Sequence, residues 1–172
     1  MEIEVSSFSP RLARQIASYN LGPNAPAHVN NGMAIPLVSF DQVSQVSDGE
    51  KLQEMLGNAS VDEHLLVDAT LPENCFAMCI EDHSMQPEFL KGDFIIVDPM
   101  LRPLPGDFVV ANIANSVSCM IRKYRQIGFD DHGNESFELM PLNNDFASAY
   151  SDKQTCRIVG VVIEHRRKYR NK

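Results

Sequence analysis

The sequence lacks any apolar run of the roughly 18 to 20 residues that cross a bilayer. Its acidic start, Met1-Glu2-Ile3-Glu4, has neither the positive region nor the apolar core of a secretory signal. We therefore expect a cytoplasmic protein that does not bind membranes. Its 172 residues, 44% hydrophobic and 22% charged, suit one compact domain with a short extension. A multidomain enzyme is not expected.

Cysteine is also scarce, because the chain has only four. This number is far below the density of a disulfide scaffold. The spacing of Cys75 and Cys79, with no second pair and no nearby histidine, is a poor zinc pattern. We expect reduced, partly buried thiols, no metal site and no cofactor.

The charge is unevenly distributed along the chain. The net charge is −8, but residues 165–172 carry five basic side chains and no acidic one, so the remainder sums to −8 − 5 = −13. Such an acidic body repels nucleic acid. For the basic end the interpretation favoured is a solvated, disordered tail. Phosphate contacts with stacking by Tyr169, and pairing with the acidic body of a partner subunit, stay open as alternatives.

The first third of the chain predicts short helices and a linker. Ser9-Pro10 is typical of a helix start, and the helix ends at Gly22. The following residues 22–26 form a Gly- and Pro-rich linker, so the two packed helices of a helix-turn-helix are not predicted in residues 1–33. A second short helix is expected over Asp48–Leu56.

From about residue 65 onward, short runs of β-forming residues alternate with turn residues, a pattern typical of an all-β domain. Turns are expected at Lys91-Gly92-Asp93, Pro105-Gly106-Asp107 and Ala114-Asn115-Ser116, so Phe108–Arg125 should form a hairpin. The predicted strands are Leu65–Val67, Cys75–Ile80, Phe94–Val97, Phe108–Ile113, Val117–Arg125, Phe137–Met140 and Arg157–Glu164.

Several spaced motifs occur together in this β region. Ser84-Met85-Gln86-Pro87 precedes a Gly-Asp turn, an apolar strand that ends in Asp98-Pro99, a second Gly-Asp turn and a second apolar strand. Met140-Pro141-Leu142-Asn143 and residues 158–162 follow. The string resembles the serine peptidase domain of LexA, UmuD and phage repressors such as lambda repressor, over roughly residues 34–165.

This resemblance implies a fold and a division of the chain. The fold is mostly β, with bent antiparallel sheets that form a partly closed domain and short helices in an N-terminal arm. Residues 1–33 would be the arm and linker, and residues 34–165 the peptidase-type domain. That domain includes a segment at 35–46 that resembles the family's self-cleavage site, and residues 166–172 would be a basic tail.

The resemblance assigns the nucleophile position to Ser84 and expects a neutral lysine on the hairpin's second strand as general base. Alignment on the tyrosine places Arg122 at the lysine position, whereas an ungapped alignment places Met120 there. Neither residue can act as the base, since the guanidinium of Arg122 stays protonated and Met120 has no basic group. Lys123 would point to the opposite face of the strand, and only a bulge would turn it inward.

Two more departures weaken the expectation of self-cleavage. Asp82 stands where family members usually have glycine, and Val43-Ser44 stands where they have a small dipeptide such as Ala-Gly. The branched valine and the lost glycine flexibility should hinder the approach to a serine. His83 beside the serine is interpreted as a local cap or a solvent-facing residue, and Glu81 with Asp82 as a solvated edge.

The leading functional hypothesis is a LexA/UmuD-like regulatory protein of SOS or prophage type, with weak or lost self-cleavage, which acts through dimerisation and protein binding. One alternative is an active self-cleaving peptidase with Ser84 as nucleophile and Lys123 as base. The other is the regulatory domain of a DNA-binding transcriptional repressor. The implied partners are a second copy and a protein such as a RecA-type filament, a repressor or a polymerase; DNA is not favoured.

Overall fold

The computed structural model describes residues 32–46, 49–57, 63–114, 119–129 and 132–169. Strands predominate, with two short helices. The elements are β1 (Gly32–Val38), α2 (Phe40–Ser44), α3 (Gly49–Gly57), β2 (His64–Asp68), β3 (Phe76–Cys79), β4 (Phe94–Asp98), β5 (Phe108–Ile113), β6 (Met120–Phe129), β7 (Glu135–Met140), β8 (Ala149–Tyr150) and β9 (Cys156–Arg166).

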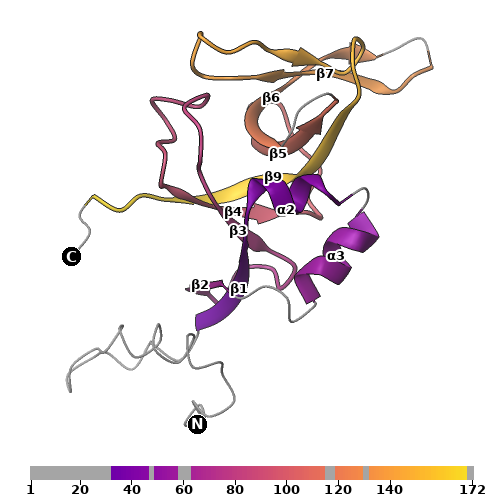
Figure 1. Cartoon of the computed structure of the whole chain (residues 1–172). Helices are drawn as coiled ribbons and strands as arrows, with labels where there is room; N and C mark the ends of the chain where they lie inside the picture. The colour runs from indigo at the N-terminus through magenta and orange to yellow at the C-terminus, as the bar shows by residue number, and fades with distance from the viewer. Residues whose placement is uncertain (1–31, 47–48, 58–62, 115–118, 130–131, 170–172) are drawn as a thin grey trace, which may run out of the picture.

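The nine strands form one open sheet in the order β2-β1-β3-β4-β9-β5-β6-β7-β8. Neighbouring strands are antiparallel except β1 and β3, which are parallel. Strand β9 joins two halves, with β1 to β4 on one side and β5 to β8 on the other (Figure 1). The prediction of a mostly-β domain is confirmed, and its strands belong to one continuous sheet.

All seven predicted strands are present, and β5 has the predicted bounds. The predicted hairpin is the antiparallel pair β5 and β6. Strands β1 and β8 and helix α2 were not predicted, whereas the helix predicted over 48–56 is α3. The helix predicted between Ser9 and Gly22 lies outside the described residues, as does most of the turn predicted at 114–116. Among the described residues, no helix is long and apolar enough to cross a membrane.

The same turn leads into β4 and into β5. In Leu90-Lys91-Gly92-Asp93 and in Leu104-Pro105-Gly106-Asp107, the aspartate Oδ2 accepts a hydrogen bond from the leucine N–H at 2.8 Å. The glycines have φ of 92° and 102°, a left-handed conformation that glycine adopts without a steric cost. Each turn reverses the chain and delivers a phenylalanine to the start of a strand.

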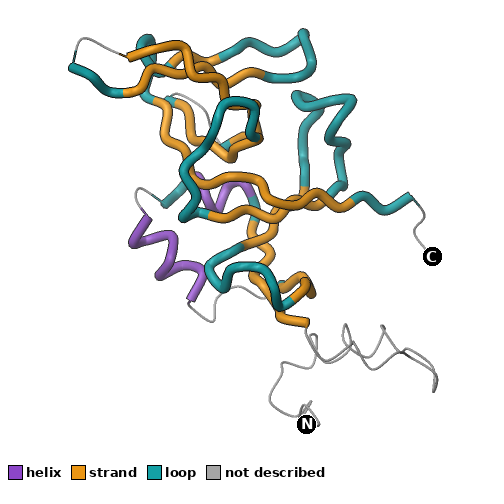
Figure 2. Tube along the Cα trace, turned by 180° about the vertical axis from the view of Figure 1, so that it is seen from behind, coloured by secondary structure: helices purple, strands orange, loops and turns teal. Residues whose placement is uncertain are grey.

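The largest buried cluster fills the space between the sheet and the two helices. It includes Val43 of α2, Leu52 of α3 and Met85 of the segment after β3. The two views of the whole chain agree that α2 lies against the middle of the sheet, close to β9 (Figures 1 and 2). Two further clusters fill the β5–β8 half and the β1–β4 half of the sheet.

Strand β9 is irregular where it joins the two halves. Its register shifts opposite Ile96/Val97 of β4 and again opposite Val110/Ala111 of β5. Between these shifts, Gly160 packs so closely on β4 that an added Cβ would lie 2.8 Å from the carbonyl oxygen of Asp98. The close approach of two backbones explains the glycine at this position.

Candidate functional site

Ser84 lies in the turn that follows β3, and it is completely buried. The Oδ1 atom of Asp82 accepts hydrogen bonds from the Ser84 N–H at 3.0 Å and from the Ser84 hydroxyl at 2.9 Å. The first is an Asx turn, in which an aspartate binds the backbone two residues on. Met85 and Phe89, which are buried in the main core, anchor the segment after it. The serine is therefore held by the fold on both sides.

A second segment, which follows β7, holds the same turn. The N–H groups of Leu142 and Asn143 donate to the Ser84 carbonyl at 3.1 and 2.9 Å, and the Asn143 side chain donates to the His83 carbonyl at 3.1 Å. The motif Met140-Pro141-Leu142-Asn143 thus contacts the serine turn. The His83 ring is exposed and lies 3.0 Å from the Gln86 amide, so it is not directed at the serine hydroxyl.

Arg122 of β6 reaches the serine hydroxyl. Its Nη1 donates to Ser84 Oγ at 2.7 Å and to the Ile121 carbonyl at 2.7 Å. The arginine is 5% exposed. Burial lowers its pKa from the usual value, whereas the charge of Asp82 raises it. The guanidinium has no lone pair to accept a proton, so it orients the hydroxyl without activating it.

The other two candidates on β6 do not reach Ser84. Arg122 pairs with Val109 and Lys123 with Phe108 in a register that continues without a shift. Because neighbouring strand residues face opposite ways, Lys123 faces away from Arg122. No hydrogen bond joins Lys123 or Met120 to Ser84 in the part of the chain that the structure describes, and Met120 packs against the β5–β8 core.

The cleavage-site-like residues Val43 and Ser44 lie in helix α2. Ser39 is the N-cap of this helix: its hydroxyl accepts from the Gln42 N–H, and the Gln42 side chain accepts from the Ser39 N–H. Val43 is fully buried in the main core. The residues expected at a scissile bond are thus in helical backbone, whereas proteolytic attack needs an extended substrate whose carbonyl is open to the nucleophile.

Three side chains hydrogen-bond to carbonyl groups of α2 and of the residues that follow it. Asn112 of β5 donates to the Ser44 carbonyl at 3.1 Å, and the Cys119 thiol donates to the Phe40 carbonyl at 3.1 Å. Arg157 of β9 donates to the Val46 carbonyl. Burial raises the pKa of Cys119 to about 12, which keeps the thiol protonated as a donor. The contacts hold the segment in its helical form.

Replacement of Asn112 with alanine should loosen this segment. Loss of one partly buried hydrogen bond costs about 1 kcal/mol of stability, and we expect faster amide hydrogen exchange at residues 41–46. Urea unfolding and hydrogen exchange with mass spectrometry measure the two effects. Asn144→Ala is the matched control, since Asn144 is exposed. Equal exchange at 41–46 in the two variants would contradict the role of Asn112.

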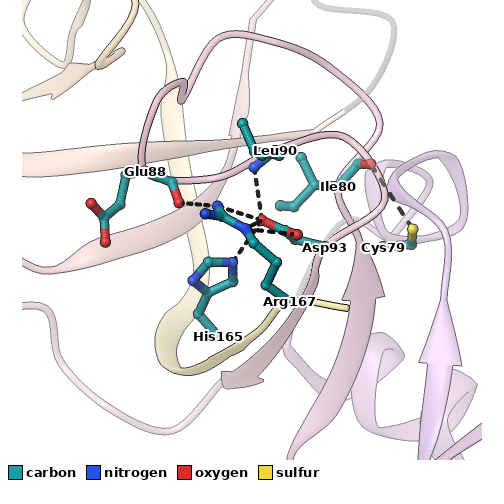
Figure 3. A network of polar contacts seen from close by, with 7 residues as sticks. All are labelled: Cys79, Ile80, Glu88, Leu90, Asp93, His165 and Arg167. Carbon is teal, nitrogen blue, oxygen red and sulfur yellow. Dashed lines mark hydrogen bonds and ion pairs between the residues drawn. The ribbon is translucent and has the colours of Figure 1, made fainter. Parts of the chain in front are cut away.

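A second polar network connects the serine segment to the end of β9 (Figure 3). Asp93 is 4% exposed and accepts from Arg167 Nε and Nη2 at 2.9 and 2.8 Å. Its Oδ2 also lies 2.8 Å from His165 Nε2, and Arg167 donates to the Glu88 carbonyl at 2.6 Å. Burial alone would raise the pKa of Asp93, but these hydrogen bonds outweigh it and lower the pKa from 3.8 to about 2.

This network changes the interpretation of the basic end. Strand β9 extends to Arg166, which donates to the Leu66 carbonyl of β2 at 2.8 Å, and Arg167 is engaged by Asp93. The expectation of a solvated tail is therefore wrong for these two arginines. Lys168 lies over the Phe94 ring at 5.3 Å, and Tyr169 is 89% exposed.

Sequence reasoning missed the contact of Asp82 with Ser84 and the buried network around Asp93. Asp82 was noted as a departure and grouped with Glu81 as a solvated edge, although its Asx-turn spacing to Ser84 could have indicated the contact. All four cysteines are free thiols, as expected. Over the described ranges, no three His, Cys, Asp or Glu side chains are grouped to hold a metal ion.

The fold and this site define a serine-peptidase-like domain: an all-β scaffold that buries a serine on the turn after a strand and faces it with a side chain from a hairpin. The chain belongs to the Peptidase S24-like family, which it matches over residues 36–163. This match confirms the predicted family resemblance.

Curated relatives agree with this assignment. The chain is 29% identical over 133 residues to the HTH-type transcriptional regulator for conjugative element R391 of Providencia rettgeri. The same identity and length are found for the regulators for element SXT of Vibrio cholerae and element pMERPH of Shewanella putrefaciens. Each match covers 74% of this chain and 57% of the relative, so the chain spans little more than half the length of these relatives. The chain is thus a LexA-like protein related to transcriptional regulators.

Proposed function

We propose that this chain is a regulatory protein that keeps the scaffold of a self-cleaving serine peptidase and has lost efficient self-cleavage. It acts by forming homodimers and binding a protein partner. The observation that carries the proposal is the hydrogen bond from Arg122 Nη1 to Ser84 Oγ at 2.7 Å, between two buried side chains. A guanidinium stands where the reaction needs a neutral base, and it has no acceptor for the serine proton.

The helical form of the cleavage-site-like segment supports the same conclusion. To present the carbonyl of Val43 to Ser84, α2 would have to unwind, lose its capping box and expose Val43 from the core. Removing the buried valine from the core alone costs about 1.5 to 3 kcal/mol. Self-cleavage by the serine–lysine route would thus need both a lysine base that the site lacks and a rearrangement that the fold opposes.

The test is intact mass after prolonged incubation of the wild type from neutral to strongly alkaline pH, beside Ser84→Ala and Lys123→Ala. We expect no scission between Phe40 and Val46 in any of the three, because alkaline pH deprotonates a lysine but leaves arginine charged. Wild-type scission that rises with pH and disappears in both variants would instead establish Ser84 and Lys123 as an active pair.

Dimerisation is tested separately by light scattering. We expect the mass of a dimer at high protein concentration, with a shift to the monomer mass on dilution. A monomer mass throughout would contradict this part of the proposal without affecting the assignment of Ser84 and Arg122.

A second candidate function is favoured by the relatives, which are named as transcriptional regulators. In this alternative the chain is the regulatory part of a DNA-binding repressor. A gel shift with DNA from the protein's own genomic neighbourhood is then expected at low salt and should weaken steeply as salt rises. No shift at low salt would exclude DNA binding by this chain.

A further inference from the structure

The Ser84 hydroxyl bridges two opposite charges. It accepts a hydrogen bond from Arg122 Nη1 and donates its own hydrogen to Asp82 Oδ1. A serine hydroxyl has one hydrogen and two lone pairs, so this geometry uses the hydrogen and one lone pair. The carboxylate on one side and the guanidinium on the other therefore hold the nucleophile position.

Arg122 depends on this bridge for its electrostatic balance. The side chain is only 5% exposed. Among the described residues, no salt bridge joins it to a carboxylate. Its Nε is buried and has no hydrogen-bond partner in the part of the chain that the structure describes. Burying a charge without compensation is costly. Asp82, linked to Arg122 through Ser84, raises the pKa of the guanidinium and supplies the opposite charge.

We infer that Asp82 is a positioning residue that favours a cation at position 122: it compensates Arg122 in this chain, and it would keep a lysine at the same position protonated. This inference rests on the proposed function. A nearby opposite charge favours the charged form of a lysine, so the lysine introduced by Arg122→Lys would stay an ammonium and could not accept the Ser84 proton. Replacing the arginine alone would then leave Ser84 poorly reactive.

An alkyl fluorophosphonate tests the serine without involving α2. Ser84 Oγ forms a bond to phosphorus, fluoride leaves, and the hydroxyl proton passes to the neutral amine at position 122. The step needs that amine to be uncharged. Asp82→Asn removes the charge while it keeps the size of the side chain and a carbonyl oxygen that accepts from the Ser84 N–H.

The experiment measures the labelling rate against pH by intact mass in Arg122→Lys and in Asp82→Asn/Arg122→Lys. We expect the midpoint of the double variant to lie at least about one pH unit below that of the single variant. Glu81→Gln/Arg122→Lys is the matched control, since Glu81 and Asp82 are adjacent exposed carboxylates, but Asp82 is the one that binds the Ser84 hydroxyl. Its profile should follow that of Arg122→Lys. Ser84→Ala added to the double variant should abolish labelling.

Superimposable profiles for the single and double variants would overturn the inference. If the reagent labels neither variant, because Ser84 is completely buried, the melting temperatures below decide. Labelling of the wild type that Ser84→Ala abolishes would instead overturn the proposed function.

A second readout needs no lysine variant: Asp82→Asn should lower the melting temperature more in the wild type than in an Arg122→Met background. Equal decreases would show that Asp82 does not compensate Arg122, and would also overturn the inference.

Discussion

The substitution Asp93→Asn is expected to lower the free energy of unfolding by about 2 kcal/mol at neutral pH. The Asp93 carboxylate is buried, and Arg167, His165 and the Leu90 N–H stabilise its charged form, so that its pKa is about 2 instead of 3.8. Asparagine preserves the volume and an acceptor for Leu90, but it removes the charge that Arg167 and His165 face. Urea unfolding of both proteins measures the loss.

The pH dependence gives this prediction a second test. Because the pKa of Asp93 is lower in the folded than in the unfolded chain, its contribution is complete above about pH 4 and is lost as pH falls through about 2. The wild type should therefore lose stability on acidification more than the Asp93→Asn variant, and the two should converge near pH 2. A gap between them that is unchanged from pH 7 to pH 2 would contradict the assignment.

The chain provides a matched control in its second Gly-Asp turn. Asp107 accepts from the Leu104 N–H at 2.8 Å, as Asp93 does from Leu90, but within the described ranges no salt bridge joins it to a cation. Asp107→Asn should therefore change stability by less than about 0.5 kcal/mol, as is usual for a conservative substitution outside the core. A loss as large as that of Asp93→Asn would show that the turn, and not the ion pair, carries the effect.

The substitution Gly160→Ala is expected to lower the free energy of unfolding by about 3 kcal/mol. Overpacking of a close backbone contact cannot be relieved by a side-chain rotation. The added Cβ would lie 2.7 Å from Val97 Cγ1, 2.8 Å from the Asp98 carbonyl oxygen and 3.0 Å from Pro99 Cα. Two of these three atoms are backbone atoms. Strand β9 would have to move away from β4, which would weaken the join between the halves of the sheet.

The measurement is again urea unfolding, with Gly57→Ala as control. A Cβ at Gly57, the last residue of α3, would meet nothing within 4 Å. Alanine there should be neutral or slightly stabilising, because alanine has the higher helix propensity. Equal losses at positions 57 and 160 would show that the contact with β4 does not limit the residue at 160.

The sequence was sufficient to predict most of the sheet, because its strands are short β-rich runs separated by Gly-Asp and Asn turns. It did not reveal α2, since five residues are too few for a helical period, although the capping box Ser39 to Gln42 was readable. Strand β1 was missed because Pro36 interrupts its run of β-forming residues in the sequence and because its neighbours β2 and β3 come later in the chain.

For the site, the family resemblance predicted Ser84 and gave two alignments of β6, and the structure shows that Arg122 contacts the serine. The register of β6 could not be read from one strand, because it depends on pairing with Val109. Asp93 is separated in sequence by 72 positions from His165 and by 74 positions from Arg167, so no local pattern reveals this network. Arg166 and Arg167 were predicted to lie in a solvated tail, because a run of basic residues does not show which acceptors the fold places beside them.

The position of β9 also bears on how this domain is made. This strand lies between β4 and β5 in the sheet but follows both in the chain. As the polypeptide leaves the ribosome, β1 to β4 and β5 to β8 can each pair locally. Strands β4 and β5 lack their common neighbour until residues 156–166 have been synthesised. The distant pairings of β9 raise the contact order, so its insertion is expected to be the late and slow event in folding. Until then, the exposed edges of β4 and β5 are where the nascent chain is open to mispairing.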